Sequence, residues 1–140
     1  MTRLSQLLLA TAVLTSCLAC QAPQTSNGVG ENRAQASFVV HDVYFELRDD
    51  SKEEIDRLVA GCFDYLLHLP GIAHFAAGRR DPGRTGGVND TGFDVSLHVW
   101  FENQDAYTTY DTHPQHLEFI EAFRENWASV RVFDSVAGGR

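Results

Sequence analysis

The sequence has few prolines, few cysteines and fewer basic than acidic residues. Its 140 residues include 4 prolines, 3 cysteines and 11 lysines and arginines against 19 acidic residues. A net charge of −8 argues against a nucleic-acid partner, because such proteins cluster lysine and arginine on one face. The apolar stretches are shorter than the about 20 residues that cross a bilayer. A hydrophobic content of 44% is typical of one globular domain with a tail.

The N-terminus has the features of an export signal. A single charged residue, Arg3, precedes a short apolar segment, 7–14. The sequence Leu-Thr-Ser-Cys that ends at Cys17 then resembles the lipobox of bacterial lipoproteins. The resemblance implies cleavage before Cys17 and acylation of its thiol. Cys20 is a second candidate, and an ordinary secretory signal cut near Ala22 is the alternative.

This reading predicts the organisation of the chain and its location. Residues 1–20 form the signal and lipobox, and the polar segment 21–37, which lacks a set of large apolar residues, forms a flexible tether. We expect an exported protein, lipid-anchored at the bacterial cell envelope on the periplasmic side or the cell surface. Its anchor is then its only contact with the membrane. The remaining cysteine, Cys62, lies on an apolar helix face, which indicates a small buried hydrophobe rather than a nucleophile or a disulfide partner.

The domain at 38–137 is predicted to contain four strands and two main helices. Alternating apolar residues predict strands at 38–47, 72–80, 93–101 and 130–136. A capping box from Ser51 to Glu54 begins the first helix, and Pro114 begins the second after a short helical turn at 103–110. The expected buried stripes are Ile55, Leu58, Val59, Cys62, Phe63, Leu66 and Leu67 in the first helix and Leu117, Ile120, Phe123 and Trp127 at the second.

The order β-α-β-β-α-β predicts an α+β domain of ferredoxin-like fold, with an antiparallel sheet and both helices on one face. In the first strand, His41 shares the apolar side that must face the helices. The opposite side of the sheet carries Tyr44, His98 and Trp100 beside Asp42 and Asp94. Aromatic residues on an uncovered sheet face indicate a partner, and a second copy related by two-fold symmetry would cover them. We therefore expect a homodimer through this exposed sheet face.

Four features, taken together on this topology, resemble the stress-response A/B barrel family of dimeric α/β barrel domains. They are His41 early in the first strand, the Leu69-Pro70-Gly71-Ile72 joint, Gly92-Phe93-Asp94 at the third strand, and the segment Tyr110-Asp111-Thr112-His113-Pro114-Gln115-His116. The resemblance implies a homodimer whose two sheets close into a barrel. It also implies a cleft in each subunit between the sheet and the helices.

The resemblance also implies candidate site residues. One plant relative is a polyketide cyclase whose catalytic tyrosine and histidine match Tyr110 and His116, with a first-strand histidine that matches His41 in the same cleft. This chain departs from that enzyme at two positions, where Val95 stands in place of a cleft histidine and Cys62 is the nearest match to a tyrosine. The catalytic correspondence is therefore partial, and the substrate does not carry over.

The residue types suit enolisation chemistry. A histidine can remove a proton next to a carbonyl near neutral pH, and a tyrosine hydroxyl can hydrogen-bond the enolate oxygen that develops. Structural roles compete with this interpretation. His113, directly before Pro114, can cap a helix, His116 can bond a neighbouring loop, and His41 can be a core histidine.

A metal site is the other use of these histidines. His113 and His116, three residues apart, could share an ion with His41. No HExxH pattern or clearly paired carboxylate accompanies them. Nothing distinguishes one histidine as an axial ligand of haem. We expect neither a metal nor a cofactor.

The sequence thus supports two functional hypotheses. The first is a homodimeric envelope protein that binds a small apolar or aromatic ligand through His41, Tyr110, His113 and His116. The alternative is a cofactor-independent enzyme of polyketide-cyclase or monooxygenase type, with Tyr110, His116 and His41 as catalytic residues. Whether the protein is an enzyme stays open at this point.

Overall fold

A computed structural model describes residues 37–138. The candidate lipidation sites, Cys17 and Cys20, lie outside the described residues, as does the tether up to residue 36. The export signal and its lipid anchor therefore stay predictions. Within the described part, no helix combines the length and the hydropathy that a membrane span requires.

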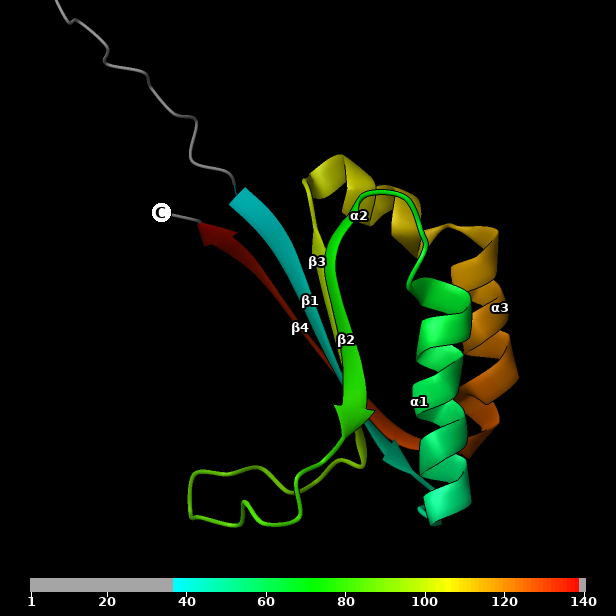
Figure 1. Ribbon diagram of the computed structural model, residues 1–140, viewed down its shortest axis with the longest axis vertical. Coiled ribbons are helices and arrows are strands. Elements are labelled where there is room, and N and C mark those ends of the chain that lie inside the picture. Colours follow the sequence, from blue (N-terminus) through cyan, green and yellow to red (C-terminus); the bar gives the residue numbers. More distant parts are fainter. Residues whose placement is uncertain (1–36, 139–140) are drawn as a thin grey trace, which may run out of the picture. The chain divides into compact units, whose positions relative to one another are not determined.

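The described chain forms a four-stranded antiparallel sheet with the strand order β2-β3-β1-β4. Helices α1 and α3 lie side by side along one face of the sheet, and α2 lies near one end of it (Figure 1). This arrangement confirms the predicted ferredoxin-like α+β fold. The elements are β1 (Ser37–Leu47), α1 (Lys52–Leu66), β2 (Ile72–Arg79), β3 (Val95–Phe101), α2 (Gln104–Asp111), α3 (Pro114–Phe123), a 3-10 turn (Arg124–Asn126) and β4 (Trp127–Gly138).

The core lies between the sheet and the two long helices, on what we call the inner face of the sheet. The residues of β1 that share the His41 side are buried, as are the alternate residues of β3 from Val95, and Phe45, Val95 and Phe101 are almost fully enclosed. Phe93, expected to begin the third strand on this side, instead precedes β3 and packs on Tyr44 of the outer face. From α1, Leu58, Cys62 and Leu66 pack into the same cluster. Burial of a large apolar side chain contributes roughly 1.5–3 kcal/mol, so this cluster is the main source of stability.

Three details of the helices differ from the sequence-based expectation. Leu117 is 51% exposed, and Trp127 is the first residue of β4, so Phe119 and Phe123 are the buried residues of α3. The reason is angular, because residues four apart share a helix face and Leu117 lies well around the helix from that pair. Phe63 is also more exposed than expected, and it covers the edge of the core against Phe75.

The capping box is only half formed. The Ser51 side chain accepts a hydrogen bond from the Glu54 backbone N–H at 3.4 Å, as expected. The return bond is absent, because the Asp49 carboxylate accepts from the Ser51 N–H at 3.0 Å and the Glu54 carboxylate accepts from Arg57. A neighbouring acid thus takes the role assigned to Glu54.

Two glycines allow close approaches that place the helices. Gly71 has φ of +79°, a conformation that favours glycine, and a Cβ there would collide with Ala106 of α2. Gly61 of α1 lies directly under the Phe123 ring of α3, with no room for a Cβ. These contacts set α2 against the start of β2 and α3 against α1.

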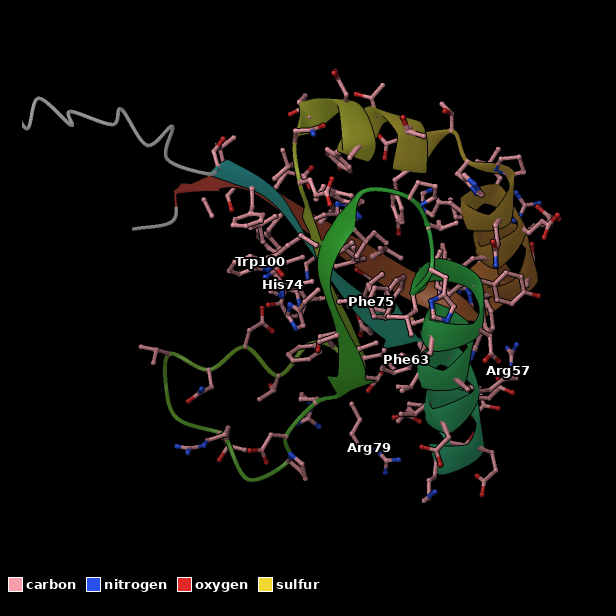
Figure 2. All side chains as sticks on the ribbon, turned by 45° about the horizontal axis from the view of Figure 1, so that its top comes forward. Arg57, Phe63, His74, Phe75, Arg79 and Trp100 are labelled. Carbon is pink, nitrogen blue, oxygen red and sulfur yellow. The ribbon has the colours of Figure 1, made fainter. Side chains whose placement is uncertain are left out.

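The other face of the sheet, the outer face, has no helical cover and carries aromatic rings. Figure 2 shows His74 and Trp100 together on this side, while Phe63 and Phe75 lie between the sheet and α1. His98 donates a hydrogen bond from Nδ1 to the Asp42 carboxylate at 2.6 Å. The outer-face aromatic residues are Phe38, Tyr44, His74, Phe93, His98, Trp100 and Phe133.

Candidate functional site

Polar side chains from β1, β4, α2 and α3 meet on the inner face of the sheet. The β1–β4 register places Asp134 directly opposite His41, so both side chains project to the inner side. The α2 residues Tyr107 and Tyr110, three apart on one helical face, lie against the His41 ring. His116, in the first turn of α3, stacks on Tyr110. We call these five residues the inner-face polar cluster.

His41 has a defined hydrogen-bonding environment. Its Nδ1 lies 2.8 Å from an oxygen of the Asp134 carboxylate and 3.0 Å from the Tyr107 hydroxyl. That hydroxyl in turn donates to the same Asp134 oxygen at 3.1 Å. His41 is only 8% exposed, whereas the Asp134 side chain is 47% exposed. The hydrogen-bonded group of His41, Tyr107 and Asp134 therefore extends from the protein interior to the solvent.

Tyr110 and His116 form a second pair of stacked rings. Their rings stack with centroids 4.2 Å apart, and the Tyr110 ring also contacts His41 edge-on at 5.9 Å. Tyr110 is almost completely buried, and its hydroxyl has no hydrogen-bond partner among the described residues. A buried polar group without a partner costs roughly 1–3 kcal/mol, so this hydroxyl is costly to keep there.

The protonation states follow from burial. Burial raises the pKa of Tyr110 above its ordinary value, and burial together with the Asp134 charge does the same for Tyr107. Both phenols are thus hydrogen-bond donors at neutral pH. Burial lowers the pKa of His116, against the opposing effect of a 3.4 Å hydrogen bond to the Asp111 carbonyl. His116 is therefore a neutral imidazole at neutral pH, with one acceptor nitrogen.

The lowered pKa of His116 predicts a loss of stability in acid. An unfolded histidine titrates near pH 6.5, so below that pH the unfolded chain binds a proton that folded His116 binds less readily. The free energy of unfolding should be fully retained above about pH 6.5 and should fall as the pH drops through the folded pKa. Urea titrations between about pH 7.5 and pH 5 should show a smaller loss in His116→Gln. Equal slopes for both proteins would contradict this assignment.

Exposed apolar side chains border the inner-face polar cluster. Along β4, Val130, Val132 and Val136 alternate with Asp134 on the inner side, yet they are 38%, 48% and 74% exposed. The exposed Asp134 carboxylate between exposed valines therefore makes this part of the inner face amphipathic.

His113 has a different position from the other candidates. Its Nδ1 accepts a hydrogen bond from the Gln115 N–H at 3.2 Å, which makes it the N-cap of α3. Its ligand-binding role therefore gains no support, and the structural alternative explains it. The described residues contain no group of three histidine, cysteine or acidic side chains arranged for a metal. Cys62 is fully buried, and burial raises the pKa of its thiol to about 12, so it is inert as a nucleophile.

An open hollow of about 530 Å³ lies on the outer face, away from the inner-face polar cluster. It is bounded by the loop between β2 and β3 and by aromatic residues of the sheet, with arginines and aspartates in equal measure. Arg131 pairs with Asp90 across it. Because this hollow opens on the face without helical cover, its location fits an interface better than a catalytic site. Its lining includes Asp42, Tyr44, Arg80, Arg84, Phe93, Arg131 and Phe133.

The sequence-based prediction missed two members of the cluster, Asp134 and Tyr107. Each carried a signal. Asp134 interrupts the alternating valines at 130, 132 and 136, and Tyr107 lies one helical turn before Tyr110. A carboxylate on an apolar strand face needs a partner, but the identity of that partner depends on the strand register.

The order of the strands and helices defines a ferredoxin-like α+β domain. The sequence of residues 39–137 matches the model of the stress responsive A/B barrel domain. Since this match covers most of the chain, the protein belongs to the stress-response A/B barrel family.

Solved structures agree with this assignment. A family member from Mesorhizobium loti with a ferredoxin-like fold is 25% identical, covers 74% of this chain and 99% of its own, and has a TM-score of 0.61. A dimeric ferredoxin-like protein of unknown function from Bacteroides fragilis is 28% identical, with coverage of 70% and 94% and a TM-score of 0.55. The hydroxynitrile lyase of Passiflora edulis is 18% identical, with coverage of 75% and 97% and a TM-score of 0.62. The dimeric protein among these structures supports a homodimer for this chain. No curated protein matches the sequence.

Proposed function

We propose that the domain acts as a homodimer that binds a small apolar or aromatic compound carrying a hydroxyl or carbonyl group. The observation that carries this proposal is the convergence of His41, Tyr110 and His116 on the inner face, beside exposed apolar side chains. Such a surface has one polar end and one apolar flank. The ligand's polar group would meet the cluster, and its apolar body would lie along Val132 and Val136.

The dimer interface is proposed to be the outer face. It presents Trp100 and Phe133 at 36% and 54% exposure, without helical cover. A second copy on this face leaves the inner face free for a ligand. The proposed lipid anchor at Cys17 would hold the dimer at the cell envelope, and it rests on the lipobox alone.

Catalysis is the second candidate function, and one observation favours it. The Asp134 carboxylate hydrogen-bonds His41 Nδ1, an arrangement that orients an imidazole for proton transfer through its other nitrogen. Tyr110 and His116 add a protonated phenol and a neutral imidazole next to it. These groups suit removal of a proton beside a carbonyl. Passiflora hydroxynitrile lyase has the same fold, which shows only that the fold can house an enzyme.

Ligand screening with a matched pair of variants tests the binding proposal. Small phenols and aryl ketones would be screened against the described domain by saturation-transfer NMR, and hits would be measured by calorimetry. Asp134→Asn should weaken a hit roughly three- to tenfold, because it removes a charged hydrogen-bond partner of His41. Asp64→Asn, on the exposed side of α1, is the control and should not change the affinity. Equal affinities for both variants would count against the site.

A further inference from the structure

Tyr107 makes hydrogen bonds near His41 that a residue with only a packing role would not need. Its ring stacks on Phe101 with centroids 5.0 Å apart and an interplanar angle of 23°, and a phenylalanine would stack equally well. The hydroxyl is the part that packing does not explain. It lies within hydrogen-bond distance of both His41 Nδ1 and one Asp134 oxygen.

The three groups close a ring of hydrogen bonds with a definite direction. An ionised carboxylate only accepts, so the Asp134 oxygen takes the protons of both Tyr107 and His41 Nδ1. The Tyr107 oxygen in turn shares the Nδ1–H of His41. Neutral His41 then carries its proton on Nδ1 and keeps a lone pair on Nε2.

Without Tyr107 this arrangement would be loosely held. Asp134 lies on the edge strand β4 with its side chain 47% exposed. His41 is buried, but water competes for the exposed carboxylate, and a carboxylate with only one protein partner can rotate. Tyr107 supplies a second bond to the same oxygen, and its ring lies 5.2 Å from the His41 ring.

We infer that Tyr107 is a positioning residue that acts through Asp134 to hold His41 in the Nδ1–H tautomer. This leaves Nε2 as the single acceptor on the ring, so the matching ligand must donate a proton there, as a phenol, an enol or an acidic C–H does. The inference rests on the proposed function for this ligand chemistry. The titratable groups in contact with His41 are Asp134 from β4 and Tyr107 and Tyr110 from α2, and His116 of α3 lies beyond them, stacked on Tyr110.

The tautomer of His41 in the ligand-free protein tests the inference. Long-range ¹H–¹⁵N NMR of the histidine rings, in mildly alkaline buffer, reports the fraction of the Nε2–H form. The intact protein should show almost only Nδ1–H. Tyr107→Phe should raise the Nε2–H fraction about two- to tenfold, the range expected for the loss of one hydrogen bond. Tyr65→Phe is the control, since Tyr65 packs on Phe119 and Phe123 away from His41 and should leave the fraction unchanged.

The outcomes separate this inference from the proposed function. An unchanged tautomer in Tyr107→Phe, with or without a loss of stability, would overturn the positioning role. A predominantly Nε2–H His41 in the intact protein would overturn it too. Because no ligand is added, failure to find a ligand would weaken the proposed function and leave the tautomer result intact. Asp134→Asn, which replaces the acceptor itself, should shift the fraction at least as far as Tyr107→Phe.

Discussion

Trp100→Glu should convert the homodimer into a monomer. Trp100 lies on the outer face, in contact with Phe38 and His74, and has no helical cover. A carboxylate there would be buried without a partner in the proposed interface, which typically costs about 3–5 kcal/mol. The dissociation constant should rise at least about a hundredfold, which shifts the equilibrium toward the monomer. Light scattering would report half the mass of the unchanged protein.

A matched variant on the opposite side of the molecule controls this result. Phe63 is 38% exposed, close to the 36% of Trp100, but it lies on α1 against Phe75 (Figure 2). Phe63→Glu should remain dimeric. Circular dichroism should show that both variants are folded. A Trp100→Glu protein that keeps the dimer mass would exclude the outer face as the interface.

Tyr110→Phe should lose ligand affinity and keep or gain stability. The Tyr110 hydroxyl is buried and has no partner in the described part of the chain, so its removal costs the free protein nothing. We expect the free energy of unfolding to stay constant or to rise by up to about 1 kcal/mol. If the hydroxyl serves a ligand, the same change should weaken binding of a screened hit about tenfold or more.

Lower affinity with unchanged or higher stability distinguishes a ligand-binding role of the Tyr110 hydroxyl from a structural role. A hydroxyl with a hidden structural role predicts lower stability on urea unfolding and unchanged affinity. Adding His116→Ala should remove the stacked partner as well, and the double variant should still show the circular dichroism of the intact fold. Loss of stability together with unaltered binding would reject Tyr110 as a ligand-contacting residue.

Most of the fold followed from local patterns in the sequence. Alternation of apolar residues located β1 and β3 and identified their inner faces, since only one side of each strand could be buried. Pro114 and His113 located the start of α3. The exceptions were positions where two residues of one helix could each have faced the core. Leu117 fits a helical stripe by spacing alone, but the neighbouring position of α1 selects Phe119 and Phe123 for the core.

The candidate site was only partly predictable. Strand alternation assigned His41 to the inner face, and the His-Pro segment placed Tyr110 and His116 near a helix start. Asp134 could not be paired with His41 before the β1–β4 register was known, because a shift of one residue moves it to the outer face. Tyr107 depended on how α2 meets the sheet, which is set by the Gly71–Ala106 approach.

The departures from the plant polyketide cyclase have a physical meaning. At the positions of its cleft histidine and helix-borne tyrosine, this chain has Val95 and Cys62, both fully buried. The apolar interior is therefore closed around these positions, and the polar groups gather toward the open edge at β4. The proposed ligand site is therefore the inner-face polar cluster near this edge, rather than the apolar interior around Val95 and Cys62.

Protein-detected NMR on the domain, titrated with the screened phenols and aryl ketones, is the most direct test of ligand binding on the inner face. Ring signals of His41 and methyl signals of Val132 and Val136 should shift together and saturate. Signals of Trp100 and Phe133, on the outer face, should change little. Shifts confined to the outer-face residues around Arg80 and Phe133, with His41 and Val132 unmoved, would contradict the account.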